Sequence, residues 1–277
     1  MSATAAPSPV LRSDATQRGR VTQRHVLRSE WTKLWSLRST RWSLLAAVVA
    51  MGGLGVLVSA IQMSRWSHLD AQERLHFRGI DHSLGGVNIA QLAIGVLGVL
   101  IISGEYSTGM IRSSMLAVPR RLPVLWAKIG VFGAVSFVLM LISAFVAFLA
   151  SQAVLTQHHV NVGLGAPHAL RAIVGTALFL TVLGILCVAI GALVRNSAGG
   201  ISTFVALLFV LPGITAILPS SVADAIHPYL PSNAGGAITQ AVPDAHLLSP
   251  WAGFALFCGY ALAAVAAAAL TLARRDV

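Results

Sequence analysis

Ser103-Gly-Glu-Tyr-Ser-Thr-Gly-Met-Ile-Arg-Ser-Ser-Met-Leu-Ala-Val-Pro-Arg-Arg121 is a polar, basic stretch between two long apolar runs. In a helical conformation it places Ile111, Met115 and Val118 at positions i, i+4 and i+7, on one apolar stripe. Pro119 ends this pattern, because a proline disfavours helical backbone in the residue before it. The stretch therefore predicts a short amphipathic helix between two membrane spans, suited to lie on a partner protein or on the bilayer surface.

The composition of the whole chain is that of a membrane protein. Of its 277 residues, 56% are hydrophobic and only 10% are charged, whereas a soluble domain has about 25% charged residues. The net charge of +10 would favour nucleic-acid binding in a soluble protein. Here the basic residues flank apolar runs, so membrane topology explains them and no nucleic-acid partner is expected. We predict an all-α, multi-pass membrane protein.

Six apolar runs are long enough to cross a hydrocarbon core of about 30 Å at about 1.5 Å per helical residue. Pro212-Gly213 predicts a kink in the fifth run, which neighbouring helices can accommodate. Small residues in these runs, among them Gly98 and Gly130, are expected to allow close helix packing. The predicted spans cover residues 42–62, 85–102, 125–155, 172–194, 199–218 and 251–272.

The N-terminal part divides into a tail and an amphipathic segment. Residues 1–23 are rich in Ser, Ala, Pro, Thr and Arg and predict a disordered tail, which leaves residues 24–277 as the six-span domain. Within residues 24–40, Trp31 and Trp35 share a helical face, and Lys33 lies off that face. Tryptophan on one side and cations on the other predict a helix in the membrane interface.

Arginine and lysine are unevenly shared between the two sides that six spans define. The side with both termini and the 103–121 stretch carries fifteen of these residues, and the other side carries four. The positive-inside rule therefore places both termini in the cytoplasm. Lys33 and Lys128 are the only lysines, and this arginine bias fits a GC-rich bacterial genome.

Several kinds of site are missing from the sequence. There is no phosphate-binding Gly-x-x-x-x-Gly-Lys-Ser/Thr motif, so any ATP and Mg must be used by another subunit. Neither His-Glu-x-x-His nor Gly-x-Ser-x-Gly occurs, which argues against a hydrolase and predicts that the chain is not an enzyme. No acidic residue falls in a predicted span, which disfavours an ion-coupled transporter. Eight of nine histidines lie on the outer side without ligand-like spacing, so no metal is expected.

Asn88 and Gln91 are polar residues of the second span, three residues apart and therefore on one helical face. They fit a substrate path, or hydrogen bonds between helices, and both interpretations stay open.

Four segments resemble one family. The chain from about residue 24 onward is similar to the bacterial permease subunits of ABC transporters of the type-2 exporter class. The segments that carry the resemblance are Ser29-Glu-Trp-Thr-Lys-Leu34, Gly104-Glu-Tyr-Ser-Thr-Gly-Met-Ile-Arg112, Pro228-Tyr-Leu-Pro-Ser-Asn-Ala-Gly235 and Arg274-Arg-Asp-Val277.

This resemblance implies a coupling helix after the second span that docks on an ATP-binding ABC subunit. Glu105 would begin that helix, where the helix dipole favours a carboxylate by roughly 0.3–1 kcal/mol, and Tyr106, Met110, Ile111 and Arg112 would bear on the ATPase. The N-terminal amphipathic helix would be a connecting helix beside it. A second copy or a paralogue would complete the transport path in the cytoplasmic membrane, with export as the direction. The alternative is a membrane-anchored protein that holds a cytoplasmic partner without transport.

Overall fold

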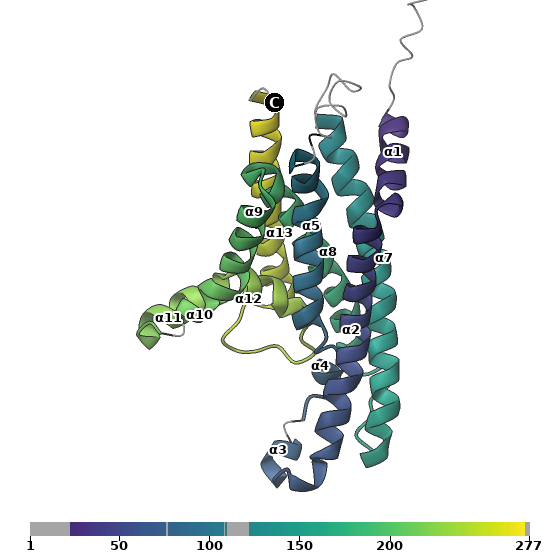
Figure 1. The fold of residues 1–277 in the computed structure, drawn as a ribbon. Coiled ribbons are helices and arrows are strands. Elements are labelled where there is room, and N and C mark those ends of the chain that lie inside the picture. Colours follow the sequence, from purple (N-terminus) through teal and green to yellow (C-terminus); the bar gives the residue numbers. More distant parts are fainter. Residues whose placement is uncertain (1–22, 76, 108, 110–121, 216, 275–277) are drawn as a thin grey trace, which may run out of the picture.

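The computed structural model describes residues 23–75, 77–107, 109, 122–215 and 217–274, and over these residues the regular structure is entirely helical (Figure 1). Six of its helical segments are long and apolar enough to cross a membrane. The predicted all-α fold with six spans is confirmed. The tail of residues 1–22 lies outside the described residues, as do Met110, Ile111 and Arg112 of the predicted coupling helix.

The spanning helices follow one another in chain order. α1 (Gln23–Ser36) leads directly into the first span, and the fifth span contains a π-helical turn at Ala206–Val210 between α9 and α10. The spans are α2 (Arg38–Ser64), α5 (Val87–Ser107), α7 (Leu122–Leu155), α8 (Ala169–Val194), α9 (Ser197–Val205) with α10 (Leu211–Thr215), and α13 (Pro250–Arg274). Shorter helices lie between them: α3 (Ala71–Leu75), α4 (Gly79–Ser83), α11 (Ser220–Ile226), α12 (Pro231–Gly236) and the 3-10 turns Trp66–His68, Thr156–His158, His227–Tyr229 and Ala237–Thr239.

The two ends of the bundle differ in what they hold. At the upper end of Figure 1 lie α1, the last turn of α5, the first turn of α7 and the last turn of α13; we call it the basic end. At the opposite, far end lie α3 and α4, while α10 and α11 run outward from the bundle. The alternation of the helices between these ends agrees with the up-and-down order that six spans require.

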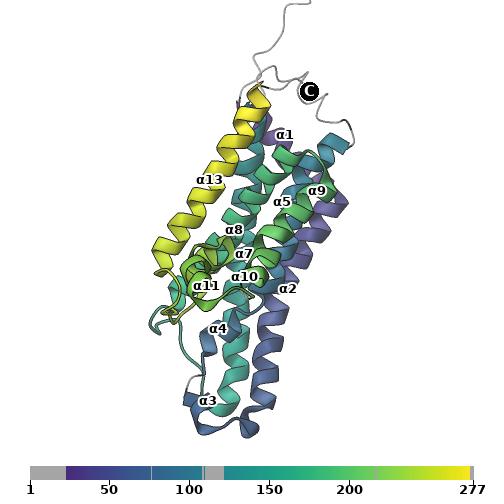
Figure 2. The ribbon, with the colours of Figure 1, turned by 90° about the vertical axis from the view of Figure 1, so that its left-hand side faces the viewer.

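α8 lies at the centre of the bundle, packed on α5, α7 and α13. Figure 2 shows α13 along one side of the molecule, with α2 on the other. The α8 face is built of fully buried residues such as Leu180, Leu183 and Cys187, and Phe132 of α7 packs into the same core. The central helix is therefore covered by the chain itself, whereas α2 and α13 keep much of their apolar surface open, as expected for helices that face lipid.

Glycines let α5 and α8 approach closely, as the sequence predicted for several of them. A Cβ added at Gly98 would lie 2.6 Å from the Gly184 carbonyl oxygen, and one at Gly191 would lie 2.7 Å from the Val99 carbonyl oxygen. No other residue type fits such a backbone contact without displacement. The prediction is wrong for Gly130 of α7, because nothing lies within 4 Å of the position of its Cβ.

The structure corrects the second span. The prediction ended it at residue 102, but α5 continues to Ser107, so Glu105 lies in the last turn of a spanning helix. Hydropathy falls at Ser103-Gly104-Glu105, yet the backbone stays helical because neighbouring elements supply partners for the polar side chains. The expectation that no acid falls in a spanning helix is therefore wrong for Glu105.

A π-helical turn lies close to the kink predicted at Pro212-Gly213. The turn spans Ala206–Val210, and α10 resumes at Leu211, one residue before Pro212. Pro212 has no backbone N–H to donate to a residue in the preceding turn, so regular α-helical hydrogen bonding is interrupted there.

The close contact between α5 and α8 gives a test of the fold. Gly98→Ala should destabilise the protein by about 1–3 kcal/mol, because the new methyl group collides with the Gly184 backbone. The matched change Gly130→Ala meets open space and should be neutral or stabilising by about 0.5–1 kcal/mol. Thermal unfolding of the detergent-solubilised variants measures both. Equal midpoints for the two variants would contradict the packing described here.

Candidate functional site

α1 packs against the start of α7 with the side that carries Glu30. Val26, Glu30 and Leu34 are its buried residues, and Val26 forms a small apolar cluster with Val124 and Ala127 of α7. Trp31 and Trp35 are exposed on α1, with ring centroids 5.9 Å apart. The two tryptophans of α1 therefore face outward, whereas the carboxylate of Glu30 faces the interior of the protein.

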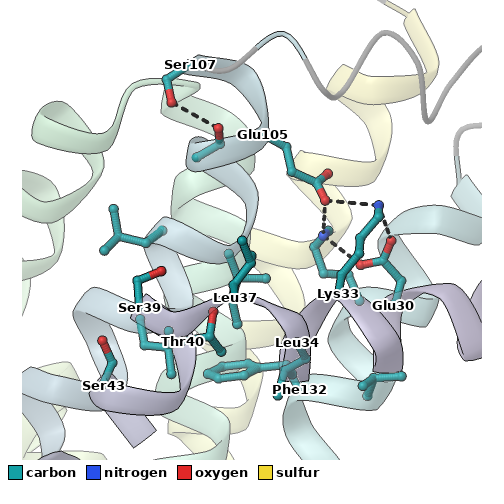
Figure 3. Close-up of a pocket in the computed structure, with 16 residues that line it drawn as sticks. Glu30, Lys33, Leu34, Leu37, Ser39, Thr40, Ser43, Glu105, Ser107 and Phe132 are labelled. Atoms are coloured by element: carbon teal, nitrogen blue, oxygen red, sulfur yellow. Dashed lines mark hydrogen bonds and ion pairs between the residues drawn. The ribbon is translucent and has the colours of Figure 1, made fainter.

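That carboxylate belongs to an ionic ring of Glu30, Lys33, Glu105 and Lys128, drawn from α1, α5 and α7 (Figure 3). Lys128 Nζ donates to Glu30 Oε2 at 2.8 Å and to Glu105 Oε1 at 2.9 Å. Lys33 Nζ donates to Glu30 Oε1 at 2.8 Å and to Glu105 Oε1 at 3.1 Å. Each lysine therefore bridges both glutamates, and the ring closes with no net charge.

Three of the four side chains in the ring are buried. Glu30, Glu105 and Lys128 are 5%, 6% and 4% exposed, while Lys33 is partly open to solvent. Removing one member of such a buried pair leaves an uncompensated charge and typically costs about 3–5 kcal/mol. The ring is therefore an all-or-none contact that fixes α1 against the ends of two spanning helices.

The two ring members on α1 titrate away from their ordinary ranges. Burial opposes ionisation of Glu30, but pairing with Lys128 and Lys33 outweighs it and lowers the pKa of this carboxyl group. Burial likewise opposes the charged form of Lys33, but hydrogen bonding and attraction to Glu30 and Glu105 raise its pKa. Glu30 and Lys33 are therefore both charged at neutral pH.

Glu105 and Tyr106 are not where the predicted coupling helix would place them. Both belong to the last turn of α5, so Glu105 does not begin a helix and gains nothing from a helix N-terminus. At a helix C-terminus the dipole disfavours a carboxylate, and here the two lysines offset it. The Tyr106 ring lies 5.4 Å from the guanidinium carbon of Arg195, at the turn between α8 and α9.

The ionic ring brackets the basic insert, which we define as residues 108–121. Glu105 lies two residues before the end of α5 at Ser107, and Lys128 lies six residues after the start of α7 at Leu122. The helices that lead into and out of the insert are thus each bonded to α1, α5 through Glu105 to Lys33 and α7 through Lys128 to Glu30. A displacement of the insert would therefore be transmitted to α1 through both flanking helices, α5 and α7.

Asn88 and Gln91, the residues predicted to line a path or to bond helices, both border a cavity of about 670 Å³ at the far end. Other parts of its wall are Phe179 of α8, Phe209 of the π-helical turn and Asn233 of α12. Asn88 Nδ2 donates only to the nearby Gly85 carbonyl oxygen, at 3.4 Å, and Gln91 makes no side-chain hydrogen bond within the part of the chain that is described. Among the described residues, neither side chain therefore makes a hydrogen bond to another helix.

One wall of the cavity is held by a clamp on the backbone of residues 240–241. Asp81 Oδ1 accepts a hydrogen bond from Ala241 N at 2.7 Å, and Arg171 donates to the carbonyl oxygens of Gln240 and Ala241 at 2.8 and 2.9 Å. Burial is the main cause that raises the pKa of Asp81. Burial also lowers the pKa of His82, whose ring stacks on Phe77 at 5.0 Å. Over the described ranges, no group of three or more His, Cys, Asp or Glu could hold a metal ion.

Comparison with protein families matches residues 26–216 to the ABC-2 family transporter proteins. The chain belongs to this family. It is therefore the membrane-spanning permease subunit of an ABC transporter, a multi-pass protein whose partner is an ATP-binding ABC subunit. Membership places it among transport proteins rather than enzymes. A comparison with curated proteins gives no match.

The central feature of this permease, the ionic ring, was not predicted from its sequence. The resemblance implies a role for Glu105, and helical spacing places Lys33 off the tryptophan face of the N-terminal helix, but neither gives a role to Glu30 or Lys128. A signal was present: the permease has only two lysines among its nineteen basic residues, and both are in the ring. Lysine is a compact charge with three donors that can serve two carboxylates at once, which a planar guanidinium does less readily.

The ring predicts a specific pattern of stability. Glu30→Gln and Lys128→Gln should each destabilise the permease by about 3–5 kcal/mol, because each leaves a buried charge unbalanced. The double variant keeps the neutral pair Lys33–Glu105 and should lose less than the sum of the two single losses. Thermal unfolding in detergent measures the cycle, with the exposed changes Arg65→Gln and Asp224→Asn as controls. Additive losses would show that the ring is not a unit.

Proposed function

We propose that this permease exports a substrate across the bacterial cytoplasmic membrane, driven by ATP and Mg in a separate ATPase subunit that contacts the basic insert. The observation that carries the proposal is the attachment of both helices flanking the insert to α1 through one buried ionic ring. A short element joined to two spans can pass a rigid-body movement to both of them. With the ring closed, α1 moves with them.

The path from the insert to the far end runs through α5. Its last turn carries Glu105 of the ring, and its first turn carries Asn88, which borders the far-end cavity. Between these points Gly98 holds α5 in backbone contact with α8, so α5 is supported along its length. Movement of the basic end would therefore reach the cavity wall as a tilt or shift of one stiff helix, which is a common element of domain movements.

The charge distribution supports a cytoplasmic basic end. The positive-inside rule favours this side because it carries fifteen of the nineteen basic residues. On α1, the exposed Trp31 and Trp35 suit the interface between headgroups and hydrocarbon. In this orientation the insert faces the compartment that holds ATP.

The far-end cavity is then on the outer side, where an exporter releases its substrate. Asn88 and Gln91 offer amide groups that could orient a substrate by hydrogen bonds. Phe179 and Phe209 offer aromatic surface that could contact the apolar part of the substrate. A second copy of the permease or a paralogue would complete the path. The alternative function is an anchor that binds a cytoplasmic protein without transport. Such an anchor would also need the insert, but it would not need this cavity.

The ATPase contact can be tested by co-purification. Replacing Met110, Ile111 and Arg112 together by Ala should abolish recovery of the ATPase subunit with the permease from native membranes, because the side chains proposed to contact the ATPase are lost. The control Lys33→Gln/Glu105→Gln retains the pair Glu30–Lys128 and the insert, and should keep the ATPase while lowering its coupling to transport. Recovery of the ATPase with the triple variant would contradict the proposed contact.

The cavity wall can be tested separately. Asn88→Leu/Gln91→Leu should lower by several-fold the amount of whichever small molecules the wild-type cells release and cells without the permease retain, as measured by mass spectrometry of the medium. The neighbouring control Ile89→Ala changes an exposed residue that does not border the cavity and should have no effect. ATPase co-purification should be unchanged in both. Unaltered release from the double variant would remove these residues from the path.

A further inference from the structure

Arg195 lies in the turn between α8 and α9, where the chain passes from the fourth span to the fifth at the basic end. Its backbone has φ = +57° and ψ = 13°, the left-handed conformation that glycine usually supplies at a helix end and that a Cβ makes costly. Its Nη2 atom is also buried without a hydrogen-bond partner among the described residues. The helix dipole favours a cation anywhere in the last turn, so it does not explain this conformation. Stability alone would favour glycine here, and the reason for arginine must lie in its side chain.

The Arg195 side chain contacts the end of α5. Its guanidinium lies over the Tyr106 ring, with the central carbon 5.4 Å from the ring centroid, a cation–π distance. Tyr106 follows Glu105 of the ionic ring and lies two residues before the basic insert. In the same turn of α5, Ser103 Oγ lies 2.9 Å from Ser197 Oγ at the start of α9, within hydrogen-bonding distance. The end of α5 is thus bonded both to the α8–α9 turn and, through the ring, to α1 and α7.

Glycines keep α9 close to α5 beyond this contact. A Cβ added at Gly200 of α9 would lie 2.6 Å from Val99 Cγ1, and one added at Gly95 of α5 would collide with the ring of Phe204, which is fully buried. The π-helical turn Ala206–Val210 begins two residues after Phe204, and α10 then runs outward from the bundle (Figure 1). α9 therefore follows α5 as far as Phe204, and the fifth span changes course after it.

The π-helical turn forms part of the wall of the far-end cavity. Leu208 and Phe209 of the turn border the cavity, as does Pro212 of α10. The Phe209 ring also meets the Phe204 ring edge-on, with the two centroids 6.1 Å apart. π-helical turns interrupt regular helical hydrogen bonding and are frequent at functional sites. The fifth span thus connects the contact at Arg195 with the cavity, and its irregular turn lies at the cavity wall.

We propose that Arg195 is a positioning residue for transport, whose contact with Tyr106 holds the start of the fifth span to the last turn of α5. When the basic insert is displaced, α9 moves with α5, and the π-helical turn converts this movement into a displacement of Leu208 and Phe209 at the cavity. This inference rests on the proposed function and adds to it a second line of transmission beside α5. Arg195 acts through Tyr106 and touches no substrate.

Two matched substitutions separate this role from a structural one. Arg195→Gly suits the left-handed backbone and removes the contact with Tyr106, so its midpoint of thermal unfolding in detergent should stay within about 4 °C of the wild type or rise. His168→Gly makes the same backbone change at an exposed residue with φ = +67°, before α8, and should raise the midpoint by about 2–4 °C. A larger fall of the Arg195→Gly midpoint would overturn the proposal, because Arg195 would then be a structural residue.

Spin labels in the assembled transporter test the transmission, in a background with Cys258 replaced. Labels at Arg28→Cys and Ser202→Cys, exposed residues of α1 and α9, report whether the start of the fifth span moves with α1. This distance should be the same with and without ATP in the wild type and in His168→Gly. In Arg195→Gly it should change on ATP binding, because α9 is no longer held to α5.

A second label pair distinguishes failure of this inference from failure of the proposed function. An ATP-dependent change of the distance between Arg28→Cys and Ile214→Cys in the wild type reports the driven movement itself. If that change occurs while Arg195→Gly leaves the Arg28–Ser202 distance constant, the role of Arg195 is overturned and the proposed function stands. If the wild type shows no change at Ile214, both are overturned.

A double-mutant cycle tests whether Arg195 acts through Tyr106. Arg195→Gly should lower several-fold the release of small molecules from cells, measured by mass spectrometry of the medium, while the ATPase subunit still co-purifies. The variant Tyr106→Leu/Arg195→Gly should release as much as Tyr106→Leu alone, because the contact is already lost. A further several-fold loss in the double variant would show that Arg195 acts elsewhere and would overturn the proposal.

Discussion

The buried ionic ring is the contact on which the basic end of the permease depends. Four side chains from three helices meet there, and each ammonium group serves two carboxylates. A buried ion pair contributes little to stability by comparison with a well-packed apolar contact, but it is intolerant of partial loss. Its value here is specificity, because α1, the last turn of α5 and the first turns of α7 have one arrangement that balances the charges.

The rest of the bundle connects this arrangement with the far-end cavity. α8 is enclosed by α5, α7 and α13, and glycines bring the α5 and α8 backbones together. A stiff α5 connects the ring at one end with the wall of the far-end cavity at the other. At the far end, Asp81 and Arg171 hold the backbone of residues 240–241, so that cavity has a wall defined by hydrogen bonds.

The number of spans could be predicted from hydropathy, because each apolar run must satisfy its backbone internally within lipid. The end of α5 could not, because Ser103, Gly104 and Glu105 look like the end of a span until their partners are known. Those partners are distant: Ser197 is 94 residues away from Ser103, and Lys33 is 72 residues away from Glu105. The exposed Trp31 and Trp35 followed from helical spacing, whereas the burial of Glu30 beside them depends on α7. The scarcity of lysine was the one local sign of the ring.

The central claim is that α1 and the helices flanking the insert move as one unit when ATP binds. It is tested most directly by distances between spin labels in the assembled transporter, with Cys258 replaced and with labels at Arg28→Cys and Ser107→Cys, or at Arg28→Cys and Ile214→Cys. Arg28 and Ser107 are exposed residues of α1 and α5, and Ile214 is exposed on α10 at the far end. We predict that the Arg28–Ser107 distance stays the same with and without ATP, while the Arg28–Ile214 distance changes. A shift of the Arg28–Ser107 distance on ATP binding would contradict it.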